Sequence, residues 1–222
     1  DQVEATPIVF SEPKSILTKI EESFIKFKRT EIKNGTKPPR TYEEAALFLA
    51  GKYKENGNIL AIVNTKKSAA TLFNLLRKNE DKTYKIHHLS TNMCPAHRRN
   101  TLKKIKASLK RREPLICVAT QLIEAGVDIS FHCVIRSLAG LDNIAQAAGR
   151  CNRNGEKSIK DVHVIRLKDE SLTRLKEIKD AQDATVGVFC TVPKGQDLLA
   201  PKAMDLFYQK YFYEHKSEMK YI

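Results

Sequence analysis

Two short segments gather residues that could act on phosphate groups. Residues 119–130 read ATQLIEAGVDIS, and residues 146–155 read QAAGRCNRNG. The second segment follows the pattern Q-x-x-G-R-x-x-R, formed by Gln146, Gly149, Arg150 and Arg153. Two arginines three apart share one face of a helix, and a converging pair of guanidinium groups suits a triphosphate, where it could stabilise charge on a transferring γ-phosphoryl. Gly149 would let a backbone approach closely.

The first segment offers polar groups directly after an apolar run. Thr120 follows that run, and its hydroxyl and backbone N–H could hold a phosphate of a nucleic-acid strand. Asp128 could accept a hydrogen bond from a ribose hydroxyl, and Gly126 would permit the turn before it. Each residue alone has a simpler explanation, with Asp128 as a helix cap and Arg153 as a solvated charge. A purely structural role for each residue explains poorly why the two segments occur together in this order and at this spacing.

Several signatures of nucleotide hydrolysis are missing. The sequence has no G-x-x-x-x-G-K-S/T phosphate loop, and the nearest approach, Gly51-Lys52, is followed by Tyr53. It also lacks G-x-G-x-x-G, a D-E-x-H/D segment to hold magnesium, and a His-Asp dipeptide. We therefore expect the 222 residues alone to be inactive as an ATPase.

Short apolar runs alternate with longer helical patterns from residue 58 onward. The predicted strands are 58–64, 85–90, 114–120, 132–137 and 162–167, and the predicted helices are 66–78, 95–112, 141–151 and 171–181. This alternation predicts an α/β fold, a parallel sheet with helices on both faces. Because ligands bind at the carboxyl ends of strands in such sheets, we expect the loops after the strands to carry the chemistry.

The flanking regions are predicted to be helical. Helices are expected over 11–29 and 41–54, with a loop between them broken by Gly35, Pro38 and Pro39, and with a capping box of Thr41 and Glu44. Residues 191–201 read as a linker, and 202–219 as an aromatic-rich helix that is more often packed against a neighbour than used for base stacking. The predicted division is 1–57 for N-terminal helices, 58–184 for the motor-like domain, and 185–222 for a linker and helix.

The charge balance favours a polyanionic partner. Lys plus Arg is 39 and Asp plus Glu is 26, a formal net charge of +13, which suggests nucleic acid, although a basic surface without a partner is the alternative. No apolar run approaches the roughly 18 residues of a membrane span, so no membrane partner is expected. Five cysteines, mostly in apolar segments, indicate a reducing, cytoplasmic location. The chain begins at Asp1 and reads as a piece of something longer.

Two clusters allow more than one interpretation. Residues 97–112 hold eight Lys or Arg and no acid, so they could track DNA, touch a partner complex, or form a solvated helix face. His87, His88, Cys94 and His97 are zinc-ligand residue types. Because neighbouring residues of a strand point to opposite faces, His87 and His88 would not face one metal ion. We therefore favour a structural role for these histidines and predict no metal site.

The motifs resemble those of a known family. TQLIEAGVDI followed by QAAGRCNR is similar to motifs V and VI of superfamily-two helicases. These residues resemble even more closely the same motifs of the CRISPR-associated helicase–nuclease of type I systems. IVNT at 62–65 looks like motif IV, HLSTNMCPAHRR at 88–99 looks like the segment after it, and 136–153 is very close to that family's pattern. Residues 203–219 resemble the linker beyond the second helicase domain. The resemblance covers 58–222.

The resemblance implies the second RecA-like domain of an ATP-driven, single-stranded DNA translocase moving 3′ to 5′. The first RecA-like domain would hold most of the ATP and its Mg²⁺, a separate nuclease domain would hold a divalent metal, and a guide-RNA surveillance complex (Cascade) would be the partner. By this resemblance Arg150 and Arg153 reach the γ-phosphate, Gln146 helps position ATP, and Gly126 and Asp128 meet the ribose side. The implied contacts to the DNA backbone are Thr65, Ser90, Thr91 and Thr120. The alternatives are half of another superfamily-two helicase, or a non-catalytic nucleic-acid-binding or docking module.

Overall fold

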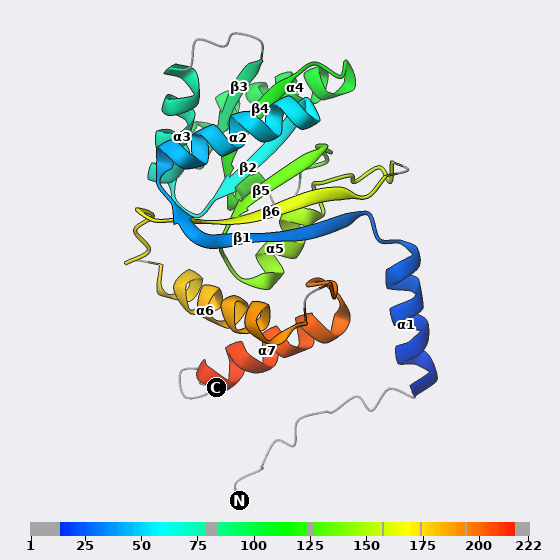
Figure 1. Cartoon of the computed structure of the whole chain (residues 1–222). Helices are drawn as coiled ribbons and strands as arrows, with labels where there is room; N and C mark the ends of the chain where they lie inside the picture. The colour runs from blue at the N-terminus through cyan, green and yellow to red at the C-terminus, as the bar shows by residue number, and fades with distance from the viewer. Residues whose placement is uncertain are drawn as a thin grey trace, which may run out of the picture.

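Six parallel strands form one sheet in the computed structural model, which describes residues 14–78, 84–123, 127–156, 158–173, 175–193 and 195–215 (Figure 1). The strand order is β1-β6-β5-β2-β4-β3. The strands are β1 Thr30–Arg40, β2 Asn58–Val63, β3 Lys85–Leu89, β4 Leu115–Thr120, β5 Cys133–Ser137 and β6 Lys160–Leu167. The helices are α1 Lys14–Lys26, α2 Tyr42–Asn56, α3 Lys66–Lys78, α4 Pro95–Lys110, α5 Leu141–Ala148, α6 Lys176–Thr191 and α7 Pro201–His215, with a 3-10 turn η1 at Gln121–Ile123. The predicted α/β class, a parallel sheet with helices on both faces, is confirmed.

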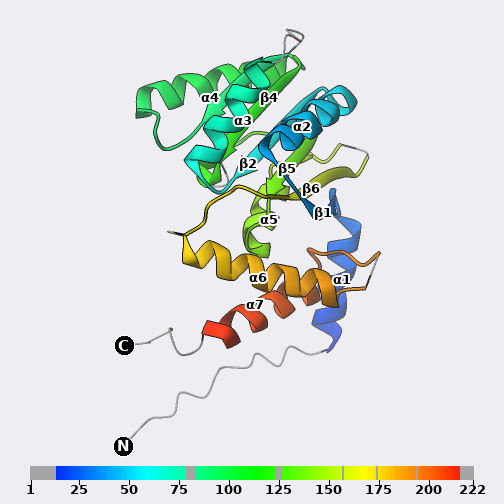
Figure 2. The same ribbon diagram turned by 60° about the vertical axis from the view of Figure 1, so that its left-hand side comes forward.

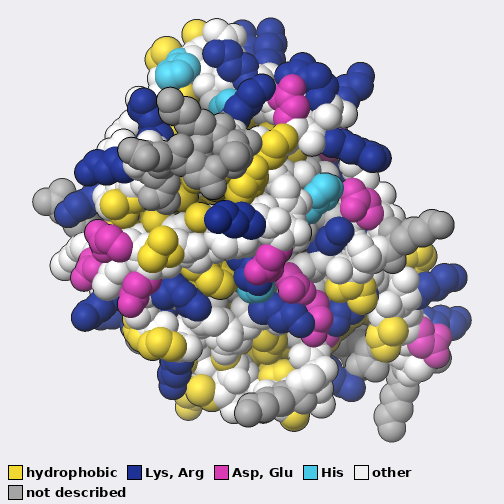
Figure 3. Space-filling view, turned by 45° about the horizontal axis from the view of Figure 1, so that its top comes forward, with side chains coloured by type: hydrophobic (Ala, Val, Ile, Leu, Met, Phe, Trp, Pro, Cys, Tyr) yellow, Lys and Arg dark blue, Asp and Glu magenta, His cyan; other side chains and the backbone are white. Residues whose placement is uncertain are grey.

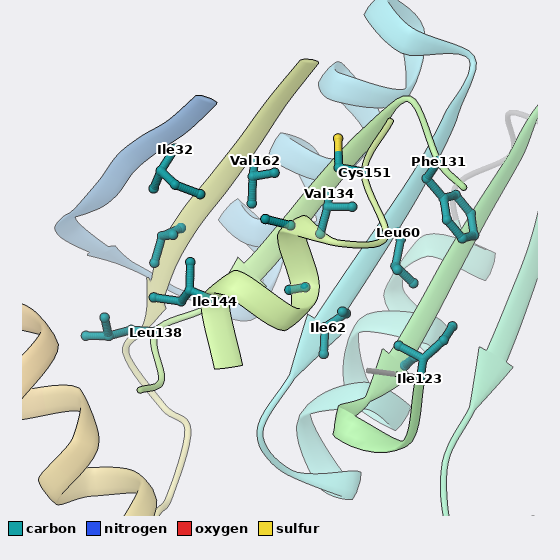
Figure 4. Close-up of a cluster of buried hydrophobic side chains, with 14 of the residues drawn as sticks. Ile32, Leu60, Ile62, Ile123, Phe131, Val134, Leu138, Ile144, Cys151 and Val162 are labelled. Carbon is teal, nitrogen blue, oxygen red and sulfur yellow. The ribbon is translucent and has the colours of Figure 1, made fainter. Parts of the chain in front are cut away.

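The sheet separates two hydrophobic cores. Alternate residues of one strand face opposite sides, so Leu60 and Ile62 of β2 enter one core while Ile59 and Ala61 enter the other. The first core is covered by α4, α5, α6 and α7, and Figure 4 shows its side chains converging from the strands and from α5. The second core is covered by α2 and α3. Because β2, β4 and β5 are buried on both faces, β2 and β4 are nearly continuous apolar runs in the sequence, and β5 is apolar up to Arg136.

The loop predicted around Gly35, Pro38 and Pro39 is wrong, because these residues belong to strand β1. β1 pairs in parallel with β6 from Thr30 to Gly35, and the register then shifts before Arg40. Proline is tolerated there because β1 lies at the edge of the sheet and the two prolines fall within the irregularity. The N-terminal region is therefore not helical throughout, and β1 joins the same sheet as β2 to β6. The outer limits of the motor-like domain stay a prediction.

Two predicted helices begin or end at different residues in the structure. The helix expected over 171–181 is α6, Lys176–Thr191. The linker after α6 passes close to the residues before β1, where Asp197 forms an ion pair with Lys28 at 2.9 Å. The helix expected over 141–151 ends at Ala148, with Gly149 as its C-cap. Arg150 and Arg153 therefore lie beyond the helix, so the helical spacing does not determine the directions of their side chains.

The predicted capping box at the start of α2 is confirmed. The Glu44 backbone N–H donates to Thr41 Oγ1 at 3.2 Å, and the Thr41 N–H donates to Glu44 Oε2 at 2.8 Å. The C-terminal aromatic helix is also present as α7, whose Phe207 is buried in the first core while Tyr208 and Phe212 stay partly exposed and stack on each other. Figure 2 shows α6 and α7 side by side beneath the sheet. Within the described residues no helix is long and apolar enough to cross a membrane.

Candidate functional site

The carboxyl edge of the sheet brings together three of the predicted DNA-contact segments. Thr120 ends β4 and stands opposite Val63 of β2, while Ala119 stands opposite Leu89 of β3. The ends of β2, β4 and β3 are therefore level, and Thr65, Thr120 and the pair 90–91 follow one another along this edge. The expectation that the loops after the strands carry the chemistry stays a prediction.

The four hydroxyl groups at this edge differ in how they meet solvent. Thr65 Oγ1 accepts the Ser68 N–H at 3.0 Å and so begins α3. Thr91 is exposed, whereas Thr120 is only 7% exposed. Ser90 is fully buried, and its hydroxyl has no hydrogen-bond partner among the described residues. Of the pair 90–91, Thr91 is thus the side chain that a ligand can reach directly.

A buried polar network behind Thr65 was missed by sequence reasoning. Asn64 donates its backbone N–H to Glu170 Oε1 at 3.0 Å and its side-chain amide to Glu170 Oε2 at 2.8 Å. Arg136 Nη1 donates to Asn64 Oδ1 at 2.7 Å, and Arg136 is completely buried. The available signal was Arg136 itself, since a charged residue in the apolar run of β5 needs partners. The network fixes the backbone from which Thr65 projects.

Arg150 is buried, and its side chain and its backbone carbonyl bond to opposite ends of the segment joining β4 to β5. Its Nε donates to the Ile123 carbonyl at 3.1 Å, and its own carbonyl accepts the Phe131 N–H at 2.9 Å. The residue is 8% exposed. Arg150 therefore holds the described ends of this segment, 121–123 and 127–131, against the end of α5.

Arg153 is exposed and makes an ion pair with Asp128. Its Nε lies 2.8 Å from Asp128 Oδ1, and the two side chains are 43% and 80% exposed. The Arg153 backbone N–H donates to Ser130 Oγ at 3.0 Å, and its carbonyl accepts from Arg29 Nη1 at 2.6 Å. The structure thus brings together Asp128 and Arg153, two of the predicted nucleotide-binding residues, although Gly126 lies outside the described residues.

Asn152 sets the position of Arg153 and was not singled out from the sequence. It has a positive φ of 48° and is 2% exposed. Its side-chain amide donates to the carbonyls of Arg29 and Ser158, each at 3.0 Å, and its Oδ1 accepts the Glu156 N–H at 2.7 Å. Asparagine tolerates the left-handed region better than most residues, so an Asn closely following a helix end was the signal that could have revealed this turn.

A cavity of about 540 Å³ lies between the end of α5 and the junction of α1 with β1. Gly149 and Arg153 line it from one side, and Phe27 and Arg29 line it from the other. A Cβ at Gly149 would lie 3.2 Å from the Gln146 carbonyl, which makes a larger residue tight there. Gln146 is exposed on the last turn of α5. The residues of the Q-x-x-G-R-x-x-R pattern therefore surround one end of α5.

Two expectations about these residues are wrong. Arg150 and Arg153 do not share a helix face, because α5 has already ended; one side chain is buried towards Ile123 and the other is exposed beside Asp128. Nor do Asp128 and Arg153 lie at the carboxyl edge. They lie near the amino ends of the strands, beside Arg29 and Ser130, because the chain after β4 returns across the sheet before β5 begins.

The histidines of strand β3 are largely buried. Burial lowers the pKa of His87, with Lys104 and Lys85 adding to the effect, and burial also lowers the pKa of His88. His88 lies against the Phe73 ring, 5.4 Å between centroids. Among the described residues, no group of three or more His, Cys, Asp or Glu side chains is arranged to hold a metal ion.

Comparisons with known proteins find similar sequences and similar folds. Residues 55–156 match the family model described as the C-terminal part of CRISPR-associated nuclease/helicase Cas3. The protein of that name from Haloferax volcanii is 51% identical over 59 residues, which make up 26% of this chain and 6% of that protein. The solved structure of T. fusca Cas3-ATP has a TM-score of 0.67 at 16% identity, covering 86% of this chain and 26% of that one.

A chain from a CRISPR RNA-guided surveillance complex in a pre-nicking state has a TM-score of 0.62 at 16% identity, covering 86% of this chain and 27% of that one. This chain therefore spans only about a quarter, or less, of the proteins it matches. The family match, the curated relative and the shared RecA-like fold together support a C-terminal helicase domain of Cas3, with the family match confined to residues 55–156.

Proposed function

We propose that this chain is the second motor domain of an ATP-dependent, single-stranded DNA translocase that works with a nuclease in type I CRISPR interference. The observation that carries the proposal is the exposed guanidinium of Arg153, which lines a cavity beside Gly149 and is held at its Nε by a surface carboxylate. An arginine presented in this way can be supplied across a cleft to a nucleotide held by another domain. The first RecA-like domain would hold ATP and Mg²⁺.

The residues around the cavity fit the anionic end of a nucleotide. Lys28, Arg29 and Arg153 line it together with Asp197, which pairs with Lys28 at 2.9 Å, so Arg29 and Arg153 are the cations left for a phosphate. The ion pair between Arg153 and Asp128 is solvent-exposed and contributes only about 0.2–1 kcal/mol. Arg153 can therefore leave Asp128 at little cost when a more highly charged phosphate is offered. Asp128, once released, could accept a hydrogen bond from the ribose side, with Gly126 permitting the turn and Gln146 helping to position the nucleotide.

Arg150 supports a mechanical link between the two ends of the domain. Its Nε bond to Ile123 and its carbonyl bond to Phe131 tie the end of α5 to the segment that starts at Thr120. A shift of residues 150–153 towards a γ-phosphate would therefore pull on the carboxyl edge of the sheet. Hydrolysis of ATP would supply the free energy that makes this shift directional.

The carboxyl edge is the proposed path of the DNA strand. The hydroxyls of Thr65, Thr91 and Thr120 follow the level ends of β2, β3 and β4. With Ser90 buried, the contribution expected from that position is its backbone. Contacts to phosphate and sugar alone carry no sequence information, which suits stepping along any strand. A guide-RNA surveillance complex would deliver the opened DNA, and the nuclease domain with its divalent metal would cut it.

The test is Arg153→Ala in the complete protein. We expect DNA-stimulated ATP hydrolysis to fall by about 10³-fold or more, the range found when arginine fingers are removed. The matched control is Arg77→Ala, an exposed arginine at the end of α3, which should leave the rate within about twofold. ATP hydrolysis that persists unchanged in Arg153→Ala would instead favour a non-catalytic binding module.

A further inference from the structure

Helix α4 carries a straight row of cations on its outermost face. Arg99, Lys103, Lys106 and Lys110 are spaced by four, three and four residues. At 3.6 residues per turn they fall within about 60° of one another around the helix. The row lies opposite the buried residues Thr101, Ile105 and Ser108, so it points directly away from the core.

The four cations of this row have no acidic counterpart. No Asp or Glu occurs between residues 84 and 112. Within the part of the chain that the structure describes, none of the four makes an ion pair. Glu113, the first acid after the row, is occupied by Lys85, Arg111 and Ser108. Like charges three and four residues apart destabilise a helix, so an unbalanced row works against the fold rather than for it.

The surroundings of α4 extend the basic surface. Lys and Arg side chains gather along the top of the space-filling view, the part of the molecule where Figure 1 places β3, β4 and α4 (Figure 3). Lys106, Lys110 and Arg112 also line a polar hollow of about 500 Å³ at the amino end of β2, which Asp128 and Glu156 line as well. The row therefore runs from the vicinity of Thr91 at the carboxyl edge to the opposite end of the sheet.

We propose that this row is a sequence-independent track for the backbone of a nucleic-acid duplex. It is about 16 Å long, from eleven helical steps at 1.5 Å each. One strand of B-DNA places a phosphate every 3.4 Å along its axis, so about five phosphates fall within this length, enough to give each of the four cations one contact. Single-strand sites normally add aromatic side chains on which bases stack. α4 has no Phe, Tyr or Trp, and its straight outer face matches a rigid duplex better than a single strand.

The four residues of this track belong neither to the proposed single-strand path, which the row approaches near Thr91, nor to the proposed nucleotide site, although Lys106 and Lys110 line the same hollow as Asp128. It depends on the charge of α4 alone and not on the motor function. The two proposals can therefore fail independently.

The test measures binding of the 222-residue chain to a labelled 20-base-pair duplex and to a 20-nucleotide single strand, by fluorescence anisotropy at 50–200 mM salt. The variant replaces Arg99, Lys103, Lys106 and Lys110 with Gln, which keeps a good helix former at each site. Each phosphate contact contributes about 0.9 to the slope of log K against log salt on duplex DNA. The variant should lose about 3.6 from that slope, so the wild-type chain should lose roughly 150-fold more affinity between 50 and 200 mM salt.

The matched control removes four exposed lysines from other elements, with Lys19, Lys37, Lys54 and Lys179 replaced by Gln. It lowers the net charge by the same four units. Because its four lysines lie on separate elements outside the row, it should change the slope by less than about 1. Circular dichroism spectra identical to wild type would show that both variants are folded. Equal slopes for the two variants would overturn the proposal, as would a loss confined to the single strand.

Discussion

Asn152 should be one of the most sensitive single positions in the region of the proposed nucleotide site. Replacement by Ala removes two hydrogen bonds from its amide, to the carbonyls of Arg29 and Ser158, and one to its Oδ1 from Glu156. Each is worth about 1 kcal/mol net. The left-handed backbone, with φ of 48°, costs alanine about 1 kcal/mol more. The sum is about 4 kcal/mol, a large share of the 5–15 kcal/mol that stabilises a typical domain.

Two further variants separate the contributions at this position. Asn152→Gly relieves the backbone cost but loses all three hydrogen bonds, so we expect a loss of about 3 kcal/mol. Asn152→Asp keeps the acceptor for Glu156 but sets a buried carboxylate oxygen against the carbonyls of Arg29 and Ser158, so its loss should exceed that of the alanine variant. The expected order of stability is wild type, Gly, Ala, Asp.

Urea unfolding followed by circular dichroism measures these differences directly. The matched control is Asn154→Ala, two residues further along and exposed, which should change the free energy of unfolding by less than about 0.5 kcal/mol. An alanine variant as stable as the glycine variant would contradict the backbone argument. A loss below 1 kcal/mol in Asn152→Ala would contradict the whole account of the turn.

Two further predictions concern the titratable groups. Burial lowers the pKa of His87, His88 and His163 from 6.5 in the folded chain, so the unfolded chain binds more protons, and the free energy of unfolding should fall as the pH drops below about 6.5 and stay level above it. Urea midpoints between pH 7.5 and 5.5 measure this fall. His88→Gln should reduce the slope of stability against pH, and a flat wild-type profile would refute the argument. Burial raises the pKa of Cys133 and of Cys151 to about 12 and also raises that of Cys117, so only the exposed Cys94 and Cys190 should react with a thiol reagent in the native state. Counting modified thiols by mass spectrometry checks this, and more than two modified sites without denaturant would contradict the buried assignment.

Most of the fold was predictable because its core strands are buried on both faces. Strands β2 and β4 appear in the sequence as unbroken apolar runs, and α3 shows one clear apolar stripe, so their type and bounds follow from pattern alone. Strand β1 was missed for the opposite reason. It lies at an edge, alternates only weakly in burial, and contains Gly35, Pro38 and Pro39, which signal a loop wherever tertiary pairing does not override them.

The candidate site was predictable in its residue types but not in its geometry. The spacing of Arg150 and Arg153 implies a shared helix face only while the helix lasts, and α5 stops at Ala148. Residue 149 is glycine and residue 152 is an asparagine with positive φ, so the chain turns between the two arginines. The buried Arg136–Asn64–Glu170 network links β5, β2 and the end of β6, and such long-range pairing leaves no local signal beyond the isolated charge.

The separation of the two groups of site residues carries a consequence for how such a domain could work. The hydroxyls at the carboxyl edge and Arg153 near the amino ends are too far apart along the sheet for one ligand to touch both, so any communication must pass through the chain between them. That chain is the segment after Thr120, and Arg150 bonds to it at Ile123 and at Phe131. Phe131 and Ile123 are both packed in the first core, where side chains cannot shift singly. A displacement at Arg150 would therefore act on Ile123 and Phe131 together, and in the proposed motor the buried arginine would couple the two ends while Arg153 would sense the nucleotide.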